Sequence, residues 1–197
     1  MRILSFAFVT IFLCAGPAAA QGWTYGVKGG VNFSSITFES PDEDRSLDWR
    51  VGAVVGGFMR FPLLSWMDLQ PEVLYTVKGG KEEAFGISSA VLLDYLEVPF
   101  LVRIPFAGRK YFIVTGPYFG VRMRARTRTE FSGATEELDV SDSVERLDYG
   151  LSAGGGVEIG SIVIDGRYSF SLSDIDADID EVKGKNRVIT ATVGFRF

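Results

Sequence analysis

The chain has 197 residues, and its 25 Asp and Glu outnumber its 20 Lys and Arg, which gives a net charge of −5. This acidic balance argues against a nucleic-acid-binding protein, which should show a basic footprint. The mean hydropathy of +0.18 suits a membrane protein. The only long apolar run, residues 3–13, is nevertheless far shorter than the roughly 20 residues of a spanning helix, so helical membrane architecture is excluded.

The sequence contains no histidine and a single cysteine. Histidine is the commonest general base and the commonest metal ligand, so Ser-His-acid and Asp-His arrangements are impossible here. We therefore predict no catalytic residue, no metal site and no cofactor, and we expect that the protein is not an enzyme.

The N-terminus has the layout of a secretory signal. Arg2 precedes an apolar stretch over residues 3–14, a helix-breaking Gly16-Pro17 follows, and three alanines end at Ala20. We predict a signal peptide over residues 1–20 and a single mature domain over residues 21–197. Cys14 leaves with the signal, so the mature chain has no disulfide bond to stabilise it.

Apolar side chains recur at every second position through the mature chain. Trp23, Tyr25 and Val27 share one phase, while Lys28 and Asn32 fall in the other. This is strand periodicity. It predicts eight strands, at about residues 23–34, 47–61, 67–77, 92–104, 111–127, 144–159, 162–172 and 186–197.

The connections between these strands alternate in length. Tight turns are expected at residues 61–65, 106–109 and 160–161, whereas residues 39–46, 79–91, 128–143 and 173–185 form longer polar connections. Short turns on one rim, long loops on the other and an even strand count are typical of an outer-membrane barrel. We predict an all-β fold, an eight-stranded antiparallel up-and-down transmembrane β-barrel with both termini periplasmic.

A soluble ligand-binding barrel such as a lipocalin also alternates, with its apolar face inward. Arg outnumbers Lys 14 to 6 in this chain, which favours a narrow polar lumen, because Arg forks satisfy carboxylates two bonds at a time. Aromatic residues also crowd the strand ends, as in a membrane girdle. The expected girdles are Trp23, Phe61, Tyr111, Phe195 and Phe197 on the periplasmic side, and Phe33, Trp49, Tyr149 and Phe170 on the outer side.

The last strand ends on Phe197, with Phe195 and further apolar residues at every second position before it. This ending resembles the C-terminal signal read by the barrel-assembly machinery. The chain resembles the PorT-like, porin-family "outer membrane protein beta-barrel domain" proteins in this strand and in Gly26–Asn32, Gln70–Tyr75, Tyr95–Pro99 and Gly116–Gly120. The resemblance covers the whole mature chain and implies a small barrel in the cell outer membrane, without catalytic residues.

Charged residues of the inward phase predict a plugged lumen, because an eight-stranded barrel is just wide enough for its own side chains. The expected ion network consists of Lys28, Glu72, Glu97, Arg103, Asp165 and Arg167. Glu72 and Glu97 are also the one conceivable pair of catalytic carboxylates. We favour a structural network centred on Glu72, Glu97, Lys28 and Arg167, because an unpaired charge in a tight lumen is costly.

Three prolines, Pro71, Pro99 and Pro117, fall inside predicted strands. A closed barrel has no edge strand on which proline is tolerated. We therefore expect a local break in the hydrogen-bond ladder at the height of these residues.

Two charged segments near the long loops allow two readings each. Arg122, Arg124, Arg126 and Arg128 recur at period two and are expected to share one face. They either neutralise nearby acids or form an anion-binding strip for the phosphates of lipid A. The second segment is an acidic loop with Asp174, Asp176, Asp178 and Asp180, where Ile179 and Lys185 break the calcium-loop pattern. It is either a solvated loop or a site of divalent-cation bridging to lipopolysaccharide or a partner.

These patterns favour a structural or surface-interaction protein of the outer membrane. A small passive pore is the alternative, and a lipid-modifying enzyme or a soluble ligand-binding barrel is less favoured. The expected partners are outer-membrane lipid and lipopolysaccharide, the barrel-assembly machinery and an extracellular partner reached through the long loops.

Overall fold

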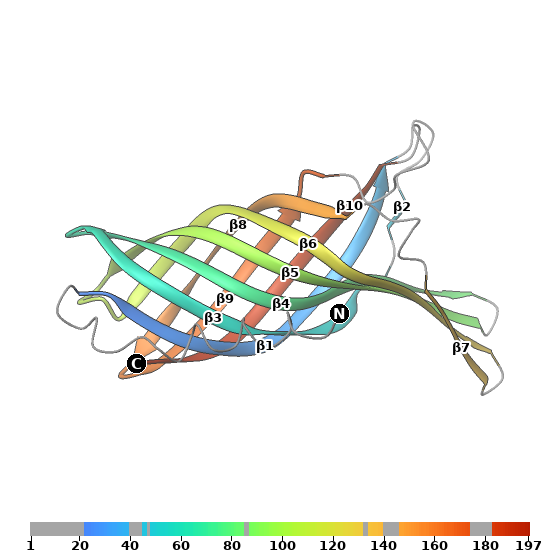
Figure 1. Cartoon of the computed structure of the whole chain (residues 1–197), viewed down its shortest axis with the longest axis horizontal. Coiled ribbons are helices and arrows are strands. Elements are labelled where there is room, and N and C mark those ends of the chain that lie inside the picture. Colours follow the sequence, from blue (N-terminus) through green and yellow to red (C-terminus); the bar gives the residue numbers. More distant parts are fainter. Residues whose placement is uncertain are drawn as a thin grey trace, which may run out of the picture.

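The computed structural model describes residues 22–39, 45–46, 48–84, 87–131, 134–139, 146–173 and 183–197. Eight strands form the barrel: β1 (Thr24–Glu39), β3 (Arg50–Leu64), β4 (Met67–Ala84), β5 (Ile87–Phe106), β6 (Tyr111–Phe131), β8 (Leu147–Ile159), β9 (Ile162–Ser171) and β10 (Lys183–Arg196). Each pairs with its neighbours in antiparallel register, and β10 pairs with β1 to close the sheet (Figure 1). The predicted eight-stranded antiparallel barrel is confirmed. The described residues contain no helix that is long and apolar enough to cross a membrane.

The barrel carries apolar side chains outside and polar side chains inside. On β9, Ile164 and Tyr168 are exposed, whereas Asp165 and Arg167, which lie between them, are buried. Val55 on β3 and Val193 on β10 are both 57% exposed. This orientation is the reverse of a soluble ligand-carrying barrel, whose apolar face lines the interior. The lipocalin-like alternative is therefore wrong.

Two further strands lie outside the eight-stranded wall. β2 (Arg45–Ser46) pairs with β1, and β7 (Ala134–Asp139) pairs with the end of β6. The ends of β4, β5 and β6 continue past the barrel, so that with β7 they form a projecting sheet (Figure 1).

The expected loops at residues 79–91 and 128–143 are therefore partly wrong. β4 continues to Ala84, β5 begins at Ile87, and β6 continues to Phe131 before β7. The polar, glycine-containing segment at residues 79–89 has no apolar face to bury, so period-two patterning cannot reveal it as strand. The strands in this region are defined by backbone pairing between the end of β4 and the start of β5.

The tight connections lie together at one end of the barrel, which we call the turn end. They comprise Ser65–Trp66, residues 107–110 and Gly160–Ser161. The C-terminus lies at this end (Figure 1), and Gly22, at the start of the described chain, lines a hollow there with Gly108 and Arg196. The opposite end, from which the projecting sheet extends, is called the loop end.

Aromatic rings surround the turn end on the outer surface. Trp23 packs edge-on against Phe61 at 4.9 Å between ring centroids, and Tyr25 stacks on Phe197 at 5.4 Å. Phe106 stacks on Tyr111 at 5.9 Å. The residues expected in the outer girdle, which are Phe33, Trp49, Tyr149 and Phe170, are all exposed.

The three strand prolines interrupt three neighbouring ladders. The pairing of β3 with β4 omits Gln70 and Pro71, that of β4 with β5 omits Val98 and Pro99, and that of β5 with β6 omits Gly116 and Pro117. On its other side each proline keeps a register partner, which is Phe100 for Pro71, Tyr118 for Pro99 and Leu151 for Pro117. The expected break in the ladder is confirmed, and it affects one side of each proline.

Candidate functional site

The interior of the barrel contains three clusters of ion pairs. The middle cluster consists of Lys28, Glu72, Asp165 and Arg167, from β1, β4 and β9. Arg167 donates two hydrogen bonds of 2.8 Å to the two carboxylate oxygens of Glu72. Lys28 Nζ lies 2.8 Å from Asp165 Oδ2 and 3.4 Å from Glu72 Oε1. All four side chains are buried, so two cations and two anions balance within a site that excludes bulk water.

The second cluster lies toward the loop end and is centred on Lys78 of β4. Its ammonium lies 2.5 Å from Glu97 Oε2 and 3.0 Å from Asp148 Oδ2. The ring of Tyr118 lies 4.6 Å from the ammonium, and the Tyr118 hydroxyl donates to Asp148 Oδ1 at 3.2 Å. Ser171 also donates to that carboxylate oxygen, at 2.7 Å. A single lysine therefore joins two carboxylates, of which Asp148 also accepts hydrogen bonds from hydroxyl groups.

The third cluster lies in the lumen near the turn end. Asp68 Oδ2 accepts hydrogen bonds from Arg103 at 3.0 Å and from Arg109 at 2.5 Å. Glu158 Oε1 lies 2.6 Å from Arg60 Nη2 and 3.0 Å from Arg103 Nη2. The guanidinium of Arg103 also packs 4.2 Å from the ring of Phe112. Three arginines and two carboxylates interlock here, with Arg103 as the shared member.

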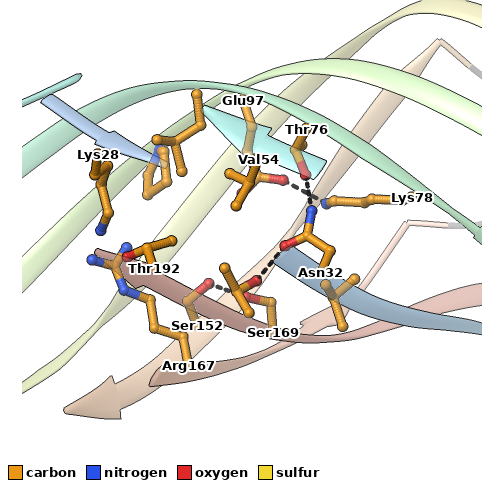
Figure 2. A pocket seen from close by; sticks show the side chains of 14 residues that line it. Lys28, Asn32, Val54, Thr76, Lys78, Glu97, Ser152, Arg167, Ser169 and Thr192 are labelled. Atoms are coloured by element: carbon orange, nitrogen blue, oxygen red, sulfur yellow. Dashed lines mark hydrogen bonds and ion pairs between the residues drawn. The ribbon is translucent and has the colours of Figure 1, made fainter. Parts of the chain in front are cut away.

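A small hollow separates the middle and loop-end clusters (Figure 2). Asn32 bridges it, donating to the Thr76 hydroxyl and accepting from Thr190 at 2.8 Å. The Ser152 and Ser169 hydroxyls lie 2.5 Å apart on its wall. The volume is about 20 Å³. Since one water needs about 10–15 Å³ by this measure, the hollow has room for a single water.

The expected network is thus divided between three clusters. Lys28, Glu72, Asp165 and Arg167 come together, but Glu97 contacts Lys78 and Arg103 contacts Asp68 and Glu158. A network centred jointly on Glu72 and Glu97 is therefore wrong. Register explains the difference, because Glu97 is level with Leu74 of β4, nearer to the loop end than Glu72.

Lys78, Asp68 and Glu158 have the inward phase of their strands, but the expected ion network did not include them. The expected network also omitted Arg109, because a turn residue belongs to neither phase of a strand. Tyr118 and Asn32 also lie in the inward phase, and their polar groups could have been expected to hydrogen-bond once the interior was assigned as charged.

A glycine allows the middle cluster to form. A Cβ atom on Gly154 would lie 2.2 Å from the carbonyl oxygen of Gly166 and 2.8 Å from Cα of Arg167. These distances are shorter than any side chain tolerates, so only glycine lets β8 approach β9 at this point. This close approach leaves room for the side chain of Arg167 to extend across the lumen to Glu72.

The four arginines of β6 do not share one face, so that expectation is wrong. Asp94 pairs with Arg124, whereas the next residue, Tyr95, pairs with Arg122, so Met123 is an extra residue. A bulge of this kind reverses the phase of the strand. Arg122 is buried on the lumen side, while Arg124 is exposed and Arg126 bonds Asp94 at 3.3 Å on the opposite face. Arginine alternates on both sides of the bulge, so no sequence signal marks it.

A small hollow opens beside this bulge at the loop end. Its volume is about 120 Å³, and it is lined by Val121, Arg122, Met123, Arg124 and Arg146. The acidic loop with Asp174, Asp176, Asp178 and Asp180 lies outside the described residues, as does the predicted signal peptide.

Comparison with known proteins agrees with this architecture. The model of the family described as "Outer membrane protein beta-barrel domain" matches residues 19–177, so the chain belongs to that family of outer-membrane proteins. The PorT-like name is not part of that match. A search of curated proteins found no match.

The comparison with solved structures matched, among others, two surface proteins of bacteria. Neisserial surface protein A (NspA) has a TM-score of 0.55 and 10% sequence identity, over 89% of this chain and 97% of that one. Ail, the attachment invasion locus protein of Yersinia pestis, has a TM-score of 0.46 and 14% identity, over 88% and 98% of the two chains. At such identities the likeness to NspA shows the fold alone.

Proposed function

We propose that the protein is a closed outer-membrane anchor that presents its loop end to partners at the cell surface. The ion pairs of the interior support this proposal most directly. Three ion clusters cross the interior, and the hollow between two of them has room for one water. A steady path for solutes would require these buried pairs to separate, which is costly.

The orientation is also part of the proposal. The turn end, with Phe197 and Gly22, would face the periplasm after removal of residues 1–20, and the projecting sheet would face outward. Short periplasmic turns and longer extracellular connections are the general pattern of such barrels. A protease added to intact cells should then cleave the connections at the loop end and leave the turns intact.

Planar-bilayer recording tests the closed lumen. Purified protein with the native sequence should give no sustained conductance. Glu97→Gln together with Asp148→Asn, which leaves Lys78 without its two acids, should produce transient openings or unfolding. A stable, voltage-independent open level with the native sequence would instead establish the passive pore.

The proposal includes no catalysis. Glu72 is held by Arg167 and Lys28, and Glu97 by Lys78, so the two carboxylates belong to different clusters. Neither is placed to act with the other as an acid and base pair. Lipid turnover by the purified barrel would contradict this part of the proposal.

The loop-end partner is expected to be positively charged, because residues 39–46, 128–143 and 173–185 each hold more acidic than basic residues. Cells displaying the protein should bind immobilised lysozyme, a basic probe, more strongly than ovalbumin, an acidic one. Replacing residues 174–180 with a neutral Gly/Ser segment of equal length should remove that difference. An unchanged preference would remove the acidic loop from the proposal.

We further propose that lipid A phosphate binds at the hollow beside the bulge. Arg122, Arg124 and Arg146 line it, next to exposed Val121 and Met123, whose apolar side chains suit the acyl region just below a headgroup. Lipid A should raise the thermal unfolding temperature of the barrel more than dephosphorylated lipid A does. Arg124→Gln and Arg146→Gln should reduce that difference, while Lys110→Gln at the turn end should leave it unchanged.

A further inference from the structure

The turn end of the barrel opens into a hollow of about 620 Å³. Its wall includes Arg60, Arg109, Lys110, Glu158 and Arg196, from four different parts of the chain: β3, the turn between β5 and β6, β8 and β10. Known small-molecule sites have volumes of about 300–1,000 Å³. The hollow, which we call the turn-end mouth, is therefore large enough for a small ligand.

Positive charge exceeds negative charge in this mouth. The ion cluster beneath it contributes Arg60, Arg103 and Arg109 against the carboxylates of Asp68 and Glu158. Lys110 and Arg196 on the wall add two further cations, which gives five cations against two anions. A concave site between low-dielectric walls concentrates the field of such an excess.

The cations on the wall have donor capacity beyond their internal contacts. Arg109 reaches Asp68 through Nη2, and its side chain is 49% exposed. Arg196 donates from Nη2 to the carbonyl of Gly160 at 3.1 Å, while its Nε is buried and makes no hydrogen bond within the described part of the chain. Lys110 Nζ lies 5.6 Å from the Tyr111 ring, a contact that leaves its ammonium protons available.

The backbone of the β5–β6 turn supports a role beyond chain reversal. Ala107, Gly108 and Arg109 have φ values of 47°, 68° and 69°, so three consecutive residues adopt the left-handed conformation. This conformation is unfavourable for residues other than glycine and persists where its surroundings enforce it, often at ligand sites. Here it directs Arg109 into the mouth, where Asp68 holds the side chain.

We propose that the turn-end mouth binds a small multivalent anion carrying two or more carboxylate or phosphate groups. A ligand with several anionic groups matches the arrangement, because the cations reach the hollow from separate strands and turns. In the orientation proposed above, this ligand would come from the periplasm. Binding in detergent micelles does not depend on that orientation, so failure here leaves the surface-anchor proposal untouched.

Titration calorimetry of the full mature barrel in zwitterionic micelles tests the site, with citrate as the carboxylate probe and pyrophosphate as the phosphate probe. At least one should bind and chloride should not compete at equal concentration. Tighter binding of citrate would identify a carboxylate ligand, and tighter binding of pyrophosphate a phosphate ligand. Absence of binding by both probes would overturn the proposal.

Variants distinguish the mouth from general attraction to a cationic surface. Lys110 and Arg196 form no ion pair within the described part of the chain. Lys110→Gln and Arg196→Gln should therefore each weaken binding of the probe by about tenfold, the effect of one lost charge-assisted hydrogen bond. Arg187→Gln removes an equal charge from an exposed side chain of β10 toward the loop end and should leave the affinity unchanged. Retained heat-modifiable migration shows that each variant is folded. Equal weakening by Arg187→Gln, or unchanged affinity in both mouth variants, would also refute the site.

Discussion

Arg167 on β9 and Glu72 on β4 join two walls of the barrel through a fork of two 2.8 Å hydrogen bonds. Three strands, β3, β1 and β10, lie between β4 and β9 along the sheet, so the fork crosses the lumen instead of following the wall. Lys28 from β1 and Asp165 from β9 complete the charge balance around it. The middle of the barrel is thus held by a cross-link as well as by backbone pairing.

Removing Glu72 should destabilise the barrel strongly. Glu72→Gln leaves Lys28 and Arg167 with only Asp165 as a carboxylate partner, and breaking one side of a buried ion pair costs about 3–5 kcal/mol. The free energy of unfolding in lipid vesicles, measured by urea titration, checks this value. Glu72→Gln, Arg167→Gln and the double variant form a cycle whose costs should not add. Additive costs would show that the fork contributes nothing as a pair.

The outward face of β3 should respond to charge according to depth. Val55 is exposed near the middle of the strand, whereas Trp49 lies just before its start. Val55→Arg should lower the free energy of unfolding in a bilayer by about 2–4 kcal/mol, and Trp49→Arg by about 0–1 kcal/mol. Measurements in vesicles of defined thickness provide the comparison. Equal costs at the two positions would argue against a membrane-spanning wall.

Phe197 should matter more for assembly than for stability. Its backbone N–H donates to Tyr25 at 2.9 Å and its exposed ring packs on Tyr25 and Phe195, so its deletion removes contacts at the rim and none in the lumen. Cells should insert less of the shortened barrel, while the purified chain should still fold in micelles. Normal insertion without Phe197 would contradict its role as an assembly signal.

Two glycines on adjoining strands should differ sharply in their tolerance of alanine. A Cβ atom on Gly154 would meet backbone atoms at 2.2 and 2.8 Å, whereas one on Gly166 would meet nothing closer than 4.0 Å. Gly154→Ala should cost about 1–3 kcal/mol through overpacking, and Gly166→Ala should be nearly neutral. Urea titration of both variants under identical conditions tests this. A large loss of unfolding free energy for Gly166→Ala alone would contradict the close contact of β8 with β9 at Gly154.

The wall of the barrel could be predicted from sequence wherever one face contacts lipid and the other contacts charge. β9 is the clearest example, because Ile162, Ile164, Tyr168 and Phe170 alternate with Asp165, Arg167 and Ser169. The inward position of the four middle-cluster residues follows from the same phase. Alternation failed at residues 79–84 and 87–89, where the sequence has no regular apolar alternation and the strands are defined by backbone pairing between β4 and β5.

Partners within the lumen could not be predicted, because phase gives the side of a residue but not its height or reach. Glu97 meets Lys78 instead of Lys28 because the register of β5 against β4 sets it nearer the loop end. The extra residue at Met123 is equally hidden, since arginine alternates before and after it. Arg109 lies in a turn with three left-handed residues, a conformation for which only Gly108 gives a sequence signal.

The gaps in backbone pairing beside the three prolines indicate where neighbouring strands of the barrel would separate first. They affect the β3–β4, β4–β5 and β5–β6 ladders, whereas the pairing that closes the barrel, between β1 and β10, runs without omission from Gly26 and Arg196 to Glu39 and Lys183. The closure of the barrel therefore has a continuous backbone ladder, unlike these three ladders. The unpaired positions lie on three neighbouring ladders away from that closure, and we expect the strands to separate there more readily than at the closure.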